Sequence, residues 1–276
     1  MSNGVLCFAN NNGKINYIKQ AVFLAKRIKQ HLDVPTSIVT STPNLINKTD
    51  RKFFDKIIEI DDENINTKRY YNGSLHHSNL IFKNNGRCQS YDLSPYDNTL
   101  VMDTDYVICN SDLRHAFTSI NDFQIYQKGT DLCPWRKFKE FEYLNDTGIK
   151  FYWATVFCFK KSENTEMFFS LLKHIEKNWI HYSRVYNLAD RNFRNDHLFS
   201  IAIHMMNGFS EGSWAKELPG KMFYTLDRDF LKNIDDSKLT FLVQKEHYLG
   251  EYILTTTYNS NVHVMNKWSL GEKINE

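Results

Sequence analysis

The sequence is short of several features that would place it in particular classes of protein. Its 276 residues include only five cysteines, scattered along the chain and without Cys-x-x-Cys spacing. This argues against a disulfide framework and against a structural zinc site, and it favours a reducing compartment. The five are Cys7, Cys88, Cys109, Cys133 and Cys158. Cys7, Cys109 and Cys158 lie in apolar runs, which predicts buried small side chains.

The chain also lacks a long apolar segment and an excess of one charge. No stretch approaches the roughly 20 apolar residues that span a bilayer, and the first eight residues lack the basic and apolar regions of a signal peptide. These absences predict a soluble, cytoplasmic protein with no membrane partner. The formal net charge is +2. A nucleic-acid partner would therefore need a local basic patch.

What is present is enough core material for a folded enzyme-sized domain. Hydrophobic residues make up 42% of the chain and aromatic residues 14%. Because there is no repeat, low-complexity tract or linker, we predict a single domain over residues 1–276.

Hydrophobic periodicity predicts an α/β fold. The pattern predicts strands over 5–9, 36–40, 56–60, 99–102, 122–127, 151–160, 239–244 and 262–265, and helices over 17–31, 163–179 and 196–206. Residues 62–90 are polar and predict a long excursion with a short helix. The opening order of strand, helix, strand, strand is typical of a Rossmann-like sheet, mixed but mostly parallel and flanked by helices.

An Asp-x-Asp triplet is the most informative motif. The apolar strand predicted over 99–102 ends in Asp103 and Asp105, with Thr104 between them. Ligands of open α/β sheets bind at the carboxyl ends of strands, and paired carboxylates suit Mg²⁺ or Mn²⁺ held by phosphates. The triplet thus predicts a metal–diphosphate clamp, and a nucleotide-sugar is the natural ligand. The alternative is that it caps a helix or closes a turn before residues 111–113.

Two further segments offer groups for a nucleotide. The first strand ends at Ala9, Asn10 and Asn11, where a base and ribose would lie in this topology, although an ordinary polar turn is the alternative. Tyr17, which begins the following helix, joins this candidate set. Arg87 could neutralise a diphosphate in a bidentate manner, or it could be a surface arginine.

Three residues late in the chain could complete a site. A neutral His263 can join two carboxylates around a metal, and Lys267 could meet a phosphate, whereas a lone histidine is often structural. Asp196 opens an apolar helix, where an acid is favoured by the helix dipole. Its functional interpretation is a carboxylate that faces the acceptor hydroxyl or the reacting carbon, as general base or electrostatic stabiliser.

Together these segments resemble the GT-A class of glycosyltransferases, nearest to the glycogenin-like branch. The resemblance is carried by residues 5–9, 99–105 and 263–268. The last of these segments is similar to the His-x-x-Gly-x-x-Lys-Pro-Trp ending of that branch. It lacks the Gly and Pro of that ending, and its spacing is shorter. It implies a GT-A fold, a UDP-sugar donor and a Mn²⁺ or Mg²⁺ ion bound by Asp103, Asp105 and His263. It also implies that Arg87 and the first loop hold the nucleotide.

Residues 94–105, 152–162 and 193–196 resemble phage-borne glycosyltransferases. That resemblance implies a hexosyl- or pentosyltransferase acting in the host cytoplasm on 5-hydroxymethylcytosine in phage DNA. Candidate DNA contacts are Lys177, His181, Arg184, Arg191 and Arg194. Aromatic rings lie between these cations, as suits a backbone groove with an extruded base, but a solvated helix face is the alternative.

Two other functions stay open. One is transfer to a surface glycan, a lipid-linked sugar or a protein. The other is binding of a nucleotide-sugar without turnover.

Overall fold

The computed structural model describes residues 1–61, 67–72, 77–82, 86–146, 148–188, 192–246 and 250–274, with 67–72 and 77–82 described as backbone only. A six-stranded sheet forms the centre of the molecule. Its order is β3 (Lys56–Glu59), β2 (Thr36–Thr40), β1 (Asn3–Phe8), β6 (Asn98–Met102), β10 (Trp153–Lys160) and β8 (Phe123–Tyr126). The first four strands are parallel, and β10 runs antiparallel to both its neighbours. The predicted mixed, mostly parallel α/β sheet is confirmed.

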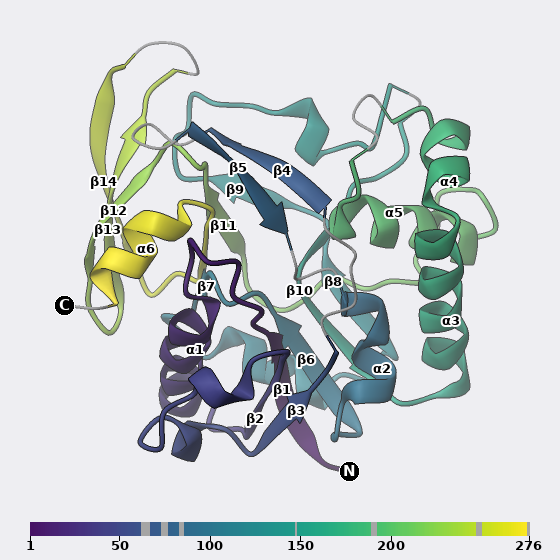
Figure 1. The fold of residues 1–276 in the computed structure, drawn as a ribbon. Coiled ribbons are helices and arrows are strands. Elements are labelled where there is room, and N and C mark those ends of the chain that lie inside the picture. Colours follow the sequence, from purple (N-terminus) through teal and green to yellow (C-terminus); the bar gives the residue numbers. More distant parts are fainter. Residues whose placement is uncertain are drawn as a thin grey trace.

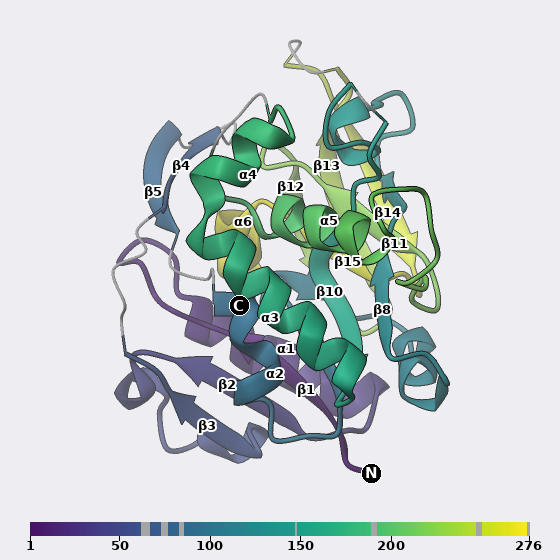
Figure 2. The same ribbon diagram turned by 90° about the vertical axis from the view of Figure 1, so that its right-hand side faces the viewer.

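Helices cover both faces of this sheet, and this explains the continuous apolar character of its central strands. Helix α1 (Tyr17–His31) packs on β1 and β2, while α5 (Asn195–Met206) packs on β10 and on α3 (Glu163–Lys177). Figure 1 places α1 on one side of the sheet and α3 on the other, and Figure 2 shows α3 in front of it. The predicted core residues are all buried: Val5, Leu6, Phe8, Val101, Met102, Val156, Phe157, Phe159, Leu198, Ile201 and Ile203.

Smaller sheets lie beside the central one. The second sheet has the order β7 (Tyr106–Val107), β15 (Val262–Val264), β11 (Met222–Thr225) and β9 (Gly129–Asp131). The third comprises β12 (Phe230–Ile234), β13 (Lys238–Gln244) and β14 (Tyr252–Tyr258). The other α-helices of the described residues are α2 (Ser90–Leu93), α4 (Trp179–Val185) and α6 (Lys267–Lys273).

Two sequence predictions need correction. Part of the segment predicted as a long excursion forms an antiparallel hairpin of β4 (Thr67–Asn72) and β5 (His77–Phe82). The sequence of β4 is mostly polar and β5 ends in three consecutive apolar residues, so neither shows the apolar alternation that signals a half-buried sheet. The helix predicted to reach residue 179 ends at Lys177. Asn178 caps it through its backbone N–H, and α4 starts directly afterwards.

The prediction that Cys7, Cys109 and Cys158 are buried is confirmed in the described part of the chain. The five cysteines are free and buried. No helix there is long and apolar enough to cross a membrane. The single domain over 1–276 stays a prediction.

A buried ion network joins the second and third sheets, and we expect it to dominate stability there. Arg136 makes two hydrogen bonds to each of two carboxylates, at 2.6 and 3.0 Å to Asp131 and at 2.7 and 2.8 Å to Asp229. Removing the cation leaves two buried carboxylates unpaired, so Arg136→Met should lower the free energy of unfolding by about 3–5 kcal/mol. Denaturant unfolding measures this. The exposed Arg184→Met is the matched control and should change it by less than about 0.5 kcal/mol. Equal losses of unfolding free energy in Arg136→Met and Arg184→Met would contradict a stabilising role for this network.

Candidate metal and nucleotide site

The fold brings the Asp-x-Asp triplet to the late histidine. Asp103 follows the last residue of β6, and a turn in which Tyr106 donates its N–H to the Asp103 carbonyl leads into β7. Strand β15 pairs antiparallel with β7, with His263 opposite Tyr106. One ligand atom from each of Asp103, Asp105 and His263 therefore lies within 4.8 Å of the others. Two carboxylates and an imidazole converge at the carboxyl edge of the central sheet.

Asp105 is the buried member of the pair, with a side chain only 4% exposed. Its Oδ2 lies 2.6 Å from Lys267 Nζ and its Oδ1 lies 3.5 Å from His263 Nε2. Burial by itself raises the pKa of the Asp105 carboxyl, but the charges and hydrogen bonds of Lys267 and His263 outweigh it and hold the pKa well below its usual range. Asp105 is therefore an anion at neutral pH.

Asp103 forms an ion pair with the buried Arg87. Burial lowers the pKa of Arg87 to about 10, against the opposing effect of the nearby carboxylates Asp196 and Asp105. The guanidinium thus stays charged at neutral pH among three carboxylates, two from the Asp-x-Asp turn and one from the start of α5. Its Nε is buried and has no hydrogen-bond partner among the described residues, so one strong donor remains for an anion.

Asp196 lies in the first turn of α5, where the helix dipole favours an acid. Its Oδ1 accepts a hydrogen bond of 2.9 Å from the Ala154 N–H, and Oδ2 lies 3.4 Å from Arg194. These contacts and the electrostatic coupling to Arg87 place Asp196 on the β10 side of the cluster. Arg194, predicted as a DNA contact, pairs with this carboxylate.

Supporting residues escaped the sequence analysis. Thr155 Oγ1 lies 3.4 Å from His263 Nδ1, which leaves Nε2 as the nitrogen facing Asp105, and the Thr155 carbonyl accepts the Asp103 N–H. Gln20 of α1 contacts the Thr104 hydroxyl at 3.3 Å and donates to the Lys267 carbonyl at 3.1 Å. In sequence these residues look like strand and helix core, and only the tertiary packing shows their role.

The predicted nucleotide loop lies at the same edge of the sheet. Cys7 of β1 is in register with Met102 of β6, so Ala9 leaves the sheet beside the Asp-x-Asp turn. Ala9, Asn10 and Tyr17 are buried. The loop amides hold local structure, because Asn10 Oδ1 accepts the Ser41 N–H at 2.8 Å and Asn11 Oδ1 accepts the Ile18 N–H at 3.2 Å.

A hollow of about 230 Å³ opens between the start of α1 and α6. Lys14, Lys19 and Lys267 line it together with Trp268. Glu272 also lines the hollow and Lys267 is paired with Asp105, but the lysines outnumber the acids, which favours an anionic ligand next to Asp105.

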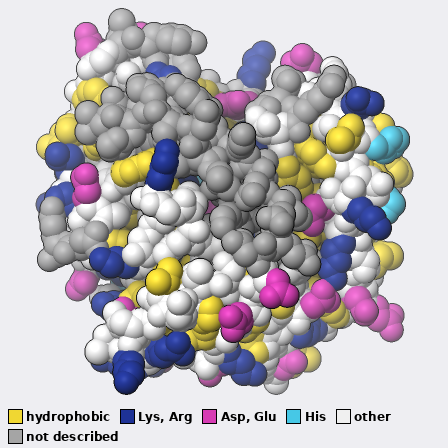
Figure 3. Space-filling view, viewed as in Figure 1, with side chains coloured by type: hydrophobic (Ala, Val, Ile, Leu, Met, Phe, Trp, Pro, Cys, Tyr) yellow, Lys and Arg dark blue, Asp and Glu magenta, His cyan; other side chains and the backbone are white. Residues whose placement is uncertain are grey.

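The remaining candidate DNA contacts lie at the end of α3 and on α4. Lys177, His181 and Arg184 are exposed, and Arg191 lies outside the described residues. On the face shown in Figure 3, basic and acidic side chains are interspersed, with Lys, Arg and His beside acids along the α3–α4 edge.

No protein-family model matches the sequence, and no curated protein matches it either. Solved structures with a similar chain path include an active-site mutant of LgtC, with 13% identity over 78% of this chain and 72% of that chain and a TM-score of 0.47. GlyE of Streptococcus pneumoniae TIGR4 has 12% identity over 79% of this chain and a TM-score of 0.44, and the match spans only 45% of GlyE. The inositol-1-phosphate CTP transferase of T. maritima has 11% identity over 79% and 85% of the two chains and a TM-score of 0.45. All three scores lie below 0.5, so a functional assignment depends on the residues of the site itself.

Proposed function

We propose that this protein is a metal-dependent GT-A glycosyltransferase that moves a sugar from a UDP-sugar to an acceptor hydroxyl. The observation that carries the proposal is the convergence of Asp103, Asp105 and His263 at the carboxyl edge of the sheet, within 4.8 Å of one another. Arg87, Lys267 and Asp196 surround these three residues. A purely structural cluster does not require this many charged side chains at one sheet edge.

The donor set fits a divalent cation such as Mn²⁺ or Mg²⁺. Two carboxylates supply hard oxygens and His263 supplies an imidazole nitrogen, oriented by Thr155. When bound, such an ion offsets the charge that builds on the leaving diphosphate.

Arg87 and Lys267 are the residues suited to the diphosphate itself. Each now pairs with a carboxylate of the proposed metal site, Arg87 with Asp103 and Lys267 with Asp105. A diphosphate would give both cations an anionic partner a short movement away, and the free Nε of Arg87 adds a donor for it. The loop of Ala9, Asn10 and Asn11, with Tyr17, would hold the base and ribose.

Asp196 is the proposed carboxylate for the reacting centre. The Ala154 N–H and Arg194 fix both of its oxygens, and a side chain held in this way costs little reorganisation during reaction. We assign it the positioning or stabilisation of the acceptor hydroxyl and the anomeric carbon.

For the acceptor, we propose the hydroxymethyl group of 5-hydroxymethylcytosine in DNA as the first candidate. Exposed Lys177, His181 and Arg184 support it as groups able to contact a phosphate backbone. Replacing Lys177 and Arg184 by glutamine should weaken DNA binding and reduce its steep dependence on salt, measured by fluorescence anisotropy. Lys48→Gln, an exposed lysine in another part of the chain, is the control. Salt-independent binding would contradict the DNA assignment.

The central test is release of UDP from a UDP-sugar. We expect release with Mn²⁺ or Mg²⁺, loss of release with EDTA, and recovery on adding back the ion. Hydroxymethylated DNA, unmodified DNA and neutral oligosaccharides offered in parallel separate the acceptors. Full turnover in EDTA would remove the metal from the mechanism, and tight UDP binding without release under any condition would indicate a binding protein.

A further inference from the structure

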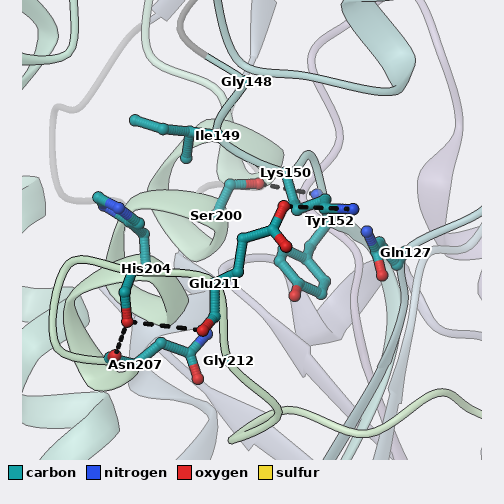
Figure 4. Close-up of a pocket in the computed structure, with 11 residues that line it drawn as sticks. Gln127, Gly148, Ile149, Lys150, Tyr152, Ser200, His204, Asn207, Glu211 and Gly212 are labelled. Atoms are coloured by element: carbon teal, nitrogen blue, oxygen red, sulfur yellow. Dashed lines mark hydrogen bonds and ion pairs between the residues drawn. The ribbon is translucent and has the colours of Figure 1, made fainter.

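A cavity of about 480 Å³ lies along the second half of α5, the helix whose first turn carries Asp196, and none of the residues of the proposed reaction site lines it. Its volume is within the range of about 300–1,000 Å³ typical of small-molecule sites. The lining comes from the end of β8, the segment 148–152, the second half of α5 and the loop 207–212. In Figure 4, Tyr152 and Gln127 lie on one side of it and His204 on the other.

The cavity has a fixed position relative to Asp196 because one helix carries both. Ser200 Oγ accepts the Tyr152 N–H at 2.8 Å and donates to the Asp196 carbonyl at 2.7 Å. With the bond from Ala154 to Asp196, two successive contacts fasten α5 to the entry of β10. His204 lies eight residues after Asp196, or about 12 Å along the helix axis, a distance that a short oligosaccharide can span.

The lining is polar and balanced in charge. Gln127, Asn207 and Ser210 offer amide and hydroxyl groups that both donate and accept hydrogen bonds. Lys150 and Glu211, whose charged atoms lie 3.8 Å apart, offset each other at the cavity. A polyanion would meet no excess of positive charge here, and a hydrocarbon chain would leave these polar groups without partners.

Two rings and a tightly packed loop complete the lining of the cavity. Tyr152 is 8% exposed, and His204 is held by the Tyr186 hydroxyl, 3.1 Å from its Nδ1. Asn207 Oδ1 accepts the Trp214 N–H, and a Cβ added to Gly212 would lie only 2.4 Å from that oxygen. Flat rings beside neutral hydrogen-bonding groups provide both the apolar and the polar contacts that a pyranose ring offers.

We propose that this cavity binds a neutral saccharide, the non-reacting part of an acceptor glycan whose reacting hydroxyl lies toward Asp196. The proposal rests on the proposed sugar transfer and supports a glycan as the acceptor, which is the alternative to 5-hydroxymethylcytosine in DNA.

The test is direct binding in the absence of donor. Saturation-transfer NMR and calorimetry would compare lactose, cellobiose and maltotriose with a sulfated heparin disaccharide and a hydroxymethylated DNA duplex. Ile149→Trp narrows the cavity, and Gln127→Ala removes one lining amide. The matched controls are Ile120→Trp at a 92% exposed position and Gln30→Ala on the exposed face of α1. We expect neutral saccharide affinity to fall about tenfold or more in Ile149→Trp and about threefold to tenfold in Gln127→Ala, with neither control changing.

Each result decides the proposal. UDP and Mn²⁺ binding, measured in the same samples, reports on the proposed function separately. Normal UDP binding with no neutral saccharide bound would overturn the cavity's assignment and leave sugar transfer standing. Equal saccharide affinities of Ile149→Trp and Ile120→Trp would also overturn the cavity's assignment. So would binding of only the sulfated disaccharide or the DNA, if Ile149→Trp abolished that binding. Failure of the wild-type protein to bind UDP would instead refute the proposed function.

Discussion

The Asp105→Asn variant should lose Mn²⁺ binding and at least about a thousandfold of its sugar-transfer rate. The expectation follows from the proposed role of Asp105, whose charge helps to hold a cation worth several kcal/mol of transition-state stabilisation. Isothermal titration with Mn²⁺ and UDP release assays measure the two losses. Asp103→Asn should behave in the same way.

A fold defect must be separated from this loss. Asp105→Asn removes the buried carboxylate that lies 2.6 Å from Lys267 Nζ, which costs stability as well as function. The double variant Asp105→Asn/Lys267→Met removes the facing ammonium group as well and should recover much of the stability, measured by thermal unfolding, without recovering Mn²⁺ binding. Wild-type Mn²⁺ affinity in a folded Asp105→Asn protein would refute the metal assignment.

The second large effect is expected from Asp196→Asn, with the transfer rate falling about 10²- to 10⁴-fold. Asparagine keeps the shape of the side chain and an oxygen to accept the Ala154 N–H, so the start of α5 should persist. Only the negative charge is lost. Affinity for UDP should change little compared with the rate, because Asp196 is assigned to the reacting centre, and steady-state kinetics with UDP competition separate the two effects.

The matched control is Asp92→Asn, which removes an exposed carboxylate paired with Lys173 on the surface. Exposed pairs contribute little, so this variant should keep both the fold and the rate. Equal rates in the Asp196→Asn and wild-type proteins would exclude Asp196 from the reaction and leave it as a residue that orders the helix start.

Local pattern was sufficient for the six strands of the central sheet, for helices α1, α3 and α5, and for the edge where the site lies. Helix α1 begins and ends at the predicted residues, because its apolar positions recur with helical period, and β2 has its predicted bounds. The short strands β7, β9 and β11 were missed, since two to four residues carry no periodicity. The strands β12 and β14 and the helices α4 and α6 were missed as well. The hairpin of β4 and β5 was missed because its sequence lacks apolar alternation.

By itself, the sequence determined an α/β chain with an acidic pair at the end of a buried strand, since hydrophobic period and residue type are local properties. The meeting of that pair with His263 and Lys267, about 160 residues later, depends on the pairing of β7 with β15. The cavity along α5 likewise depends on Ser200 holding Tyr152 across segments that share no sequence pattern. Long-range contacts of this kind arise from backbone hydrogen bonding and packing in three dimensions, and only the tertiary structure decided them.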